Sequence, residues 1–101
     1  MGNWRYTLVK GEALREYISN EDQENVLDTL KECYKEIHQN FPSEFEDYEL
    51  EDVIDDIDNE KDNIENYEDY GLTEDDVREN IDYLLGNFYD LCDALRIWIS
   101  L

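Results

Sequence analysis

The chain has 101 residues, of which 41% are hydrophobic and 13% aromatic, and its formal net charge is −21. This length and apolar content suit one folded domain, residues 1–101, whereas the net charge alone would be typical of a disordered chain. No apolar run approaches the roughly 18 residues that a membrane span needs, and no basic patch supports direct nucleic-acid binding. One histidine and three serines leave few side chains for catalysis, so we expect a protein that is not an enzyme.

The negative charge is concentrated in one third of the chain. Residues 43–76 hold seventeen acidic residues and a single base, Lys61, for a net charge of −16. The flanking segments, 1–42 and 77–101, have net charges of only −3 and −2. This uneven distribution predicts one highly charged surface on an otherwise ordinary domain.

The first half of the chain predicts a strand followed by helices. Residues 4–9 are β-prone and roughly alternating, which favours a short strand or an extended arm. Apolar residues at helical spacing then predict helices at 12–19 and 26–37, and Pro42 ends the second of them. We expect the two cysteines, which lie on apolar helical faces without a CxxC spacing, to be buried free thiols in a reducing cytoplasm.

The acidic segment predicts a third helix. Ser43 and Glu46 fit a capping box at its start, and Gly71 suits the position just after its end. The stem of Lys61 is expected to fill a gap in its apolar stripe. That stripe, which we expect to be buried, consists of Leu50, Val53, Ile54, Ile57 and Ile64.

The last helix has the strongest local signal in the chain. Thr73 and Asp76 fit a capping box, and Leu72 can form a hydrophobic staple with Val77. Apolar residues then recur at helical spacing for about five turns. Residues 96–101 either end this helix or form a short strand that pairs with residues 4–9. The predicted fold is therefore mainly α, a compact bundle of about four helices.

The acidic residues of the third helix fall into two rows on either side of its apolar stripe. Members of the first row are three or four residues apart, which places neighbours about 5–6 Å from each other along roughly 27 Å of helix. Like charges at these spacings repel by about 0.2–0.5 kcal/mol per pair, and an ordinary solvated face would intersperse lysines. The first row is Glu51, Asp55, Asp58, Asp62, Glu65 and Asp69, and the second row is Glu49, Asp52, Asp56 and Glu60.

Two plainer explanations of the charge remain open. The acidic segment could be a solubilising surface without a partner. A halophilic proteome would also supply acidic residues, but it would spread them evenly. The nine asparagines, eight isoleucines and two alanines instead look like the product of an AT-rich genome.

A calcium loop is a third alternative. Asp58, Glu60, Asp62 and Asp69 match positions 1, 3, 5 and 12 of such a loop. Asn63 stands where glycine should make the turn, the last position is Asp rather than Glu, and the helical stripe runs through the segment. We therefore predict no metal site and no cofactor. Acid–base catalysis would need a carboxyl group in a cleft with a raised pKa, and these carboxylates look exposed.

A rigid double row of carboxylates suits a basic partner. Duplex DNA presents one charge per about 1.7 Å of axis, and the two rows give about half that density, which is close enough to compete for a DNA-binding groove. Tyrosines among the acids would add aromatic contacts of the kind that dominate interface energies. Besides the two rows, the expected partner-binding residues are Tyr67, Glu68, Tyr70, Glu74, Asp75 and Asp76.

In its size, charge and acidic–aromatic texture, seen in NYEDYGLTEDD (66–76), the chain resembles the acidic DNA-mimic inhibitors of phages and mobile elements. These are anti-restriction proteins and anti-CRISPR inhibitors of Cas nucleases, and the resemblance covers residues 44–90 in character. It implies a stoichiometric inhibitor that occupies the DNA-binding or PAM-reading cleft of a Cas nuclease or restriction enzyme in the cytoplasm of a bacterial host. The chain is also similar to the immunity proteins of nuclease toxins, which block a basic nuclease surface, and this alternative remains open.

Overall fold

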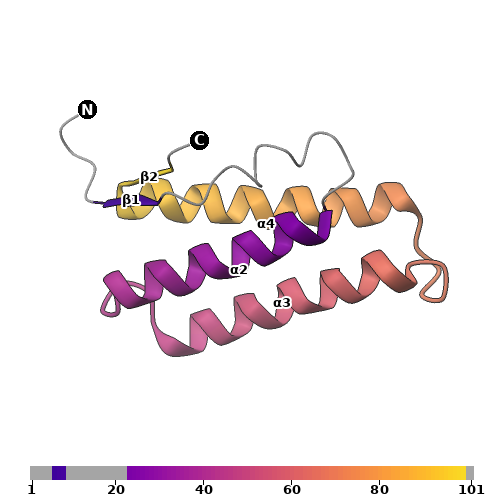
Figure 1. Cartoon of the computed structure of the whole chain (residues 1–101), viewed down its shortest axis with the longest axis horizontal. Helices are drawn as coiled ribbons and strands as arrows, with labels where there is room; N and C mark the ends of the chain where they lie inside the picture. Colours follow the sequence, from indigo (N-terminus) through magenta and orange to yellow (C-terminus); the bar gives the residue numbers. More distant parts are fainter. Residues whose placement is uncertain (1–5, 9–22, 100–101) are drawn as a thin grey trace.

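The described part of the protein is mainly helical, as predicted. The computed structural model describes residues 6–8 and 23–99 (Figure 1). The helix predicted at 12–19 lies outside these residues, so a fourth helix stays a prediction. In chain order the elements are β1 (Tyr6–Leu8), α2 (Gln23–Asn40), α3 (Asp47–Asn66), α4 (Glu74–Leu95) and β2 (Ile97–Ile99).

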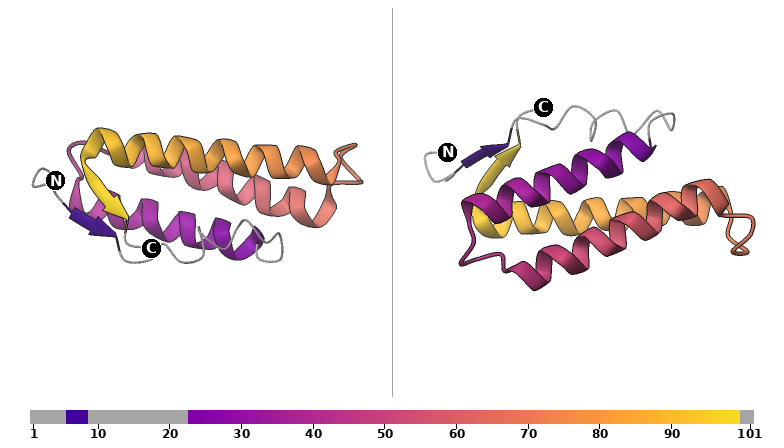
Figure 2. Two further views of the ribbon diagram at one scale, coloured as in Figure 1. Left: turned by 90° about the horizontal axis from the view of Figure 1, so that it is seen from above. Right: turned by 60° about the horizontal axis from the view of Figure 1, so that its bottom comes forward.

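The three helices lie side by side along the long dimension of the protein (Figures 1 and 2). α3 runs antiparallel to both α2 and α4, so these two run in the same direction. α2 contacts both other helices, and α3 contacts α4. The α3–α4 turn lies at one end of the helical layer, and the α2–α3 connection lies at the other. None of the described helices has the length and apolar character needed to cross a membrane.

A two-stranded parallel sheet joins the two ends of the described chain. Tyr6 pairs with Ile97 and Leu8 pairs with Ile99. The chain turns out of α4 at Arg96, which has a left-handed conformation with φ of 57° and donates its backbone N–H to carbonyl groups in the last turn of the helix. The structure describes only β1 within the segment for which a strand was predicted, residues 4–9.

The core is built mainly by α2 and α4, and α3 contributes far less than predicted. Ile57 is the one fully buried side chain of α3, whereas α2 and α4 each bury six residues. The remaining members of the predicted α3 stripe are only partly buried. The prediction of a buried stripe is therefore correct for Ile57 and wrong for Leu50, Val53, Ile54 and Ile64, because none of the described helices covers the side of α3 that faces away from α2 and α4.

Connecting residues and cysteines complete this core. Phe41 and Phe45, in the connection between α2 and α3, are buried, and Tyr34 packs against Phe45 with a ring-centroid distance of 5.7 Å. Cys33 and Cys92 are buried free thiols, as predicted. Burial raises the pKa of Cys92 to about 12, so this thiol is protonated and unreactive at neutral pH.

The start of α4 follows the sequence signal, whereas α3 ends earlier than predicted, at Asn66, and Gly71 ends the turn that follows it. Thr73 Oγ1 accepts a hydrogen bond from the Asp76 backbone N–H, and the Asp76 carboxylate accepts one from the Thr73 N–H, which confirms the capping box. Gly71 has φ of 73°, and the Gly71 and Leu72 N–H groups donate to the Glu68 and Tyr67 carbonyl groups. This is the Schellman pattern expected of a glycine that follows a helix.

The predicted capping box at the start of α3 is wrong. The N-cap residue is Glu46, whose side chain makes no capping hydrogen bond, and Ser43 lies in the preceding turn. Backbone hydrogen bonds from Glu44 and Phe45 to the Phe41 carbonyl group hold that turn, and Phe45 is buried in the core. Burial of Phe45 therefore sets where the helix begins, and the local Ser–Glu pattern does not.

Removing the cap of α4 should weaken the fold. We expect Thr73→Ala to lower the free energy of unfolding by about 0.5–2 kcal/mol, because it leaves an N–H group of the first turn without its acceptor. Urea denaturation followed by circular dichroism measures this change. Thr73→Ser, which keeps the hydroxyl group, is the control and should stay close to the original stability. Equal losses for the two variants would contradict the capping role.

Candidate functional site

The two acidic rows lie on opposite sides of α3, except for Asp69, which the sequence placed on the helix and the structure places in the turn after it, because α3 ends at Asn66. The first row faces the α2 side, where Asp58 accepts a hydrogen bond from Lys31 of α2 at 2.8 Å. The second row faces the α4 side, where Asp56 and Glu60 line a groove together with Tyr83 of α4. The apolar contact of α3 lies between them. Together with the turn that follows α3, the rows form a surface that we call the acidic surface, defined by the sixteen residues predicted from the sequence.

Most of the acidic surface is open to solvent. Twelve of its sixteen residues are exposed, and the four half-buried ones are Glu49, Glu60, Tyr67 and Asp76. Tyr67 is half-buried and packs against the hydrophobic core. Its neighbour Tyr70 is 54% exposed and does project from the surface.

Two lysine salt bridges connect α2 and α3 in the described part of the chain. Lys31 of α2 reaches Asp58 of α3, and Lys61 of α3 reaches Asp28 of α2 at 2.5 Å. The hydrogen bond to Asp28 is the main cause of a raised pKa for Lys61. Of the ten carboxylates in the two rows, Asp58 alone has a salt bridge within the described part of the chain. The other nine have no salt bridge in residues 6–8 and 23–99.

Like charges meet where α2 begins. Glu24 of α2 lies beside Glu65 of the first row, and a hydrogen bond between the two carboxyl groups raises the pKa of Glu24, with burial and charge repulsion adding to the effect. A raised carboxyl pKa means that ionising both groups disfavours the folded state. At Glu65 the first row therefore includes a position that lowers the stability of the fold.

Tyrosine hydroxyl groups tie the acidic surface together at the α3–α4 turn. Tyr70 Oη donates to Asp62 at 2.6 Å, and Asn66 Nδ2 donates to the same carboxylate at 2.9 Å. Tyr67 Oη donates to Glu74 at 3.2 Å. These hydrogen bonds are the main cause of a raised pKa for both tyrosines, which keeps them protonated as donors. Residues that are eight and seven positions apart in the sequence are thus held in one cluster.

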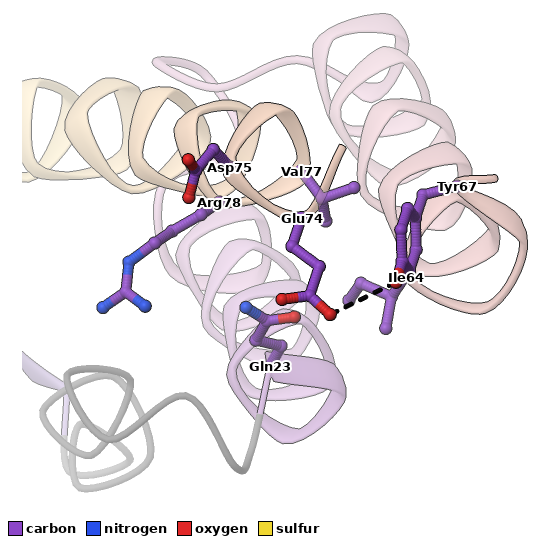
Figure 3. A pocket seen from close by; sticks show the side chains of 7 residues that line it. All are labelled: Gln23, Ile64, Tyr67, Glu74, Asp75, Val77 and Arg78. Atoms are coloured by element: carbon purple, nitrogen blue, oxygen red, sulfur yellow. Dashed lines mark hydrogen bonds between the residues drawn. The ribbon is translucent and has the colours of Figure 1, made fainter. Parts of the chain in front are cut away.

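A cavity of about 310 Å³ opens beside this cluster, where the start of α2 meets the end of α3 and the start of α4 (Figure 3). Tyr67 and Glu74 point toward each other on one side of it, and the Gln23 side chain lies near the Glu74 carboxylate. Three of its lining residues, Tyr67, Glu74 and Asp75, were predicted from the sequence to bind a partner. The other four were not predicted, because none of them is an acidic residue or a tyrosine. The lining residues are Gln23, Ile64, Tyr67, Glu74, Asp75, Val77 and Arg78.

The calcium-loop alternative does not fit the backbone. Residues 58–66 belong to α3, so Asp58, Glu60 and Asp62 lie along a helix and cannot converge on one ion as loop residues do. In residues 6–8 and 23–99, no group of three or more His, Cys, Asp or Glu side chains is arranged to hold a metal ion. The arrangement of the acidic surface suits binding of a cationic surface instead.

Comparisons of the chain with protein-family models, with curated proteins and with solved structures find no match.

The pair of Glu24 and Glu65 predicts a pH-dependent stability. Because the pKa of Glu24 is raised above its ordinary value of 4.5, its contribution to stability is complete below that value and is lost as the pH rises through the raised pKa. Glu24→Gln should therefore stabilise the protein at about pH 7 and make little difference at about pH 4. Urea denaturation at both pH values measures the effect. If Glu24→Gln stabilised the protein equally at both pH values, repulsion between Glu24 and Glu65 would not be the cause.

The change in stability on removing a charge from the first row should depend on which carboxylate is replaced. Asp55→Asn removes repulsion from its row neighbours and no salt bridge, so we expect a gain of about 0.2–0.5 kcal/mol for each relieved pair. Asp58→Asn also breaks the bond to Lys31, worth about 0–1 kcal/mol at an exposed site, and should gain less or lose. Thermal denaturation of the two variants at low salt compares them. If the two variants gain the same stability, the Lys31–Asp58 salt bridge does not contribute to the stability of the fold.

Proposed function

We propose that this protein is a stoichiometric inhibitor that binds the basic nucleic-acid-binding cleft of a bacterial defence nuclease in place of DNA. The observation that carries the proposal is the pair of carboxylate rows on α3, of which only Asp58 has a salt bridge in the described residues. The target class is a Cas nuclease or a restriction enzyme in the cytoplasm of a bacterial host. The role requires no catalytic group and no cofactor.

The charge density of α3 supports competition with DNA. Its 20 residues span about 30 Å, and the nine row carboxylates that lie on α3 supply about one charge per 3 Å of helix. Duplex DNA supplies one per about 1.7 Å. A cleft that neutralises phosphates with lysine and arginine would therefore meet roughly half the charge density of its normal ligand. Dense negative charge would also accelerate association.

Rigidity supports the same proposal. α3 is held by the burial of Ile57, by the salt bridges of Lys31 and Lys61 to the opposite helix, and by the Tyr70–Asp62 bond at its end. A surface that is ordered before binding loses little conformational freedom when the partner arrives, so more of the interaction energy appears as affinity. Carboxylates on a flexible tail would lack this advantage.

An immunity protein against a nuclease toxin is the second candidate. The compact cluster at the α3–α4 turn favours it, because Tyr70, Asp62, Tyr67 and Glu74 combine aromatic rings and carboxylates within one small area. Such a cluster is typical of an interface hot spot that is specific to one partner. The two candidates differ in which part of the acidic surface carries the binding energy.

Competition with DNA tests the main proposal. We expect a purified target nuclease to lose activity when the protein is added before duplex DNA and to keep activity when DNA is bound first. Affinity should also fall steeply as salt is raised from low to high concentration, because exposed charges are screened beyond about 8–10 Å. Fluorescence anisotropy with labelled DNA and with labelled protein measures both effects. Equal inhibition of the DNA-loaded nuclease would reject mimicry.

Mutations at the two parts of the acidic surface separate the candidates. For a DNA mimic, Glu51→Gln, Asp55→Asn and Asp52→Asn should each weaken binding modestly, and Tyr70→Ala should have no larger effect. For an immunity protein, Tyr70→Ala should abolish binding while the row variants change little. Tyr70→Phe is the matched control, since it keeps the ring and removes only the hydroxyl group bonded to Asp62. Titration calorimetry ranks the five variants.

A further inference from the structure

The groove between α3 and α4 differs from the rest of the acidic surface because side chains of two helices form its walls. It has a volume of about 250 Å³ and contains carboxylates, amides, an aromatic ring and an aliphatic side chain. Sequence analysis had selected only two of its residues, because the others come from α4 or are uncharged. The lining residues are Asp56, Asn59 and Glu60 of α3 with Asn80, Tyr83 and Leu84 of α4.

The charge in this groove is not neutralised by its walls. Asp56 and Glu60 are one helical turn apart and repel each other, and no lysine or arginine is among the described residues that line the groove. On the α2 side, in contrast, Lys31 pairs with Asp58 of the first row. The groove is therefore a part of the acidic surface where an incoming cation meets no lysine or arginine in the walls.

Two features of the walls point to the shape of that cation. Tyr83 is 70% exposed, the largest exposed fraction among the exposed large hydrophobic residues of the described chain, and its ring stands beside the carboxylates. Glu60 has one carboxylate oxygen, Oε2, that is buried without a hydrogen-bond partner in the described residues. A buried acceptor without a donor is unfavourable, so a ligand that lets Glu60 turn toward the groove and accept hydrogen bonds there relieves this cost.

We propose that the α3–α4 groove binds an arginine side chain of the basic partner. The inference rests on the proposed function, since it assumes a basic protein as partner, and it adds which side chain is recognised and where. A guanidinium group is flat, carries five N–H donors and stacks on aromatic rings. It can donate to Asp56 and Glu60 and to the amide oxygens of Asn59 and Asn80 while it stacks on Tyr83. The Leu84 side chain packs against its methylene stem.

Arginine fits this groove better than lysine does. A lysine ammonium is a compact, strongly hydrated charge with three donors and no planar face, so it gains less from the ring and from the dispersed acceptors. A cation over an exposed tyrosine contributes a factor of about two to five in affinity. The groove should therefore discriminate between two ligands of equal charge, which the open carboxylate rows cannot do.

Two synthetic peptides test the inference on the isolated full-length protein. One has three arginines alternating with glycine, and the other has three lysines in the same positions. We expect the arginine peptide to bind about two- to fivefold tighter in a nuclear magnetic resonance titration at low salt. Its largest backbone amide shifts should occur at Asp56, Glu60, Asn80 and Tyr83. Tyr83→Ala should remove the preference for arginine, and Glu60→Gln should reduce it.

Tyr48→Ala is the matched control. Tyr48 is 60% exposed on the same acidic helix and does not line the groove, so its removal should leave the arginine preference unchanged. Equal affinities for the two peptides, a preference that survives Tyr83→Ala, or shifts spread evenly along the first row would overturn the groove inference. None of these outcomes bears on whether the protein competes with DNA. Inhibition of a DNA-loaded nuclease would reject mimicry and leave the peptide result standing.

Discussion

The narrow contact that holds α3 against α2 and α4 is the constraint on which the rest of this structure depends. Ile57 is the one side chain of α3 that is fully removed from water, and partly buried neighbours extend the contact along the helix. Because the contact is narrow, most of the circumference of α3 faces solvent. A helix in this position can carry two rows of carboxylates with most of them exposed, and the described part of the structure has no fully buried charged residue.

The charge on α3 is not there for stability. The Lys31–Asp58 and Lys61–Asp28 bridges are partly exposed, and such pairs contribute about 0–1 kcal/mol each. Repulsion within the rows and between Glu24 and Glu65 acts in the opposite direction. Stability comes instead from the α2–α4 core and from the caps of α4. A surface that weakens its own fold is easier to understand if a partner uses it, and this supports the proposed inhibitor role.

The tyrosines near the acids have different physical roles. Tyr67 is half-buried and bonds to Glu74, so it closes the α3–α4 turn. Tyr70 is exposed but also bonds to Asp62, which fixes the orientation of a row carboxylate. Tyr83 stands open beside the α3–α4 groove. The ring that is most available to a partner is therefore the one outside the acidic segment, on α4.

The sequence by itself determined the helices, the α4 capping box, the Gly71 turn and the exposure of most of the acidic surface. Each of these depends on residues within about one or two turns of each other, where periodicity and hydrogen-bonding side chains act directly. Only the tertiary structure decided that Phe45 sets the start of α3, that Lys31 reaches Asp58 across 27 positions, and that Tyr83 joins Asp56 and Glu60 in one groove. These features depend on which faces of separate helices meet, and packing of the whole core fixes that choice.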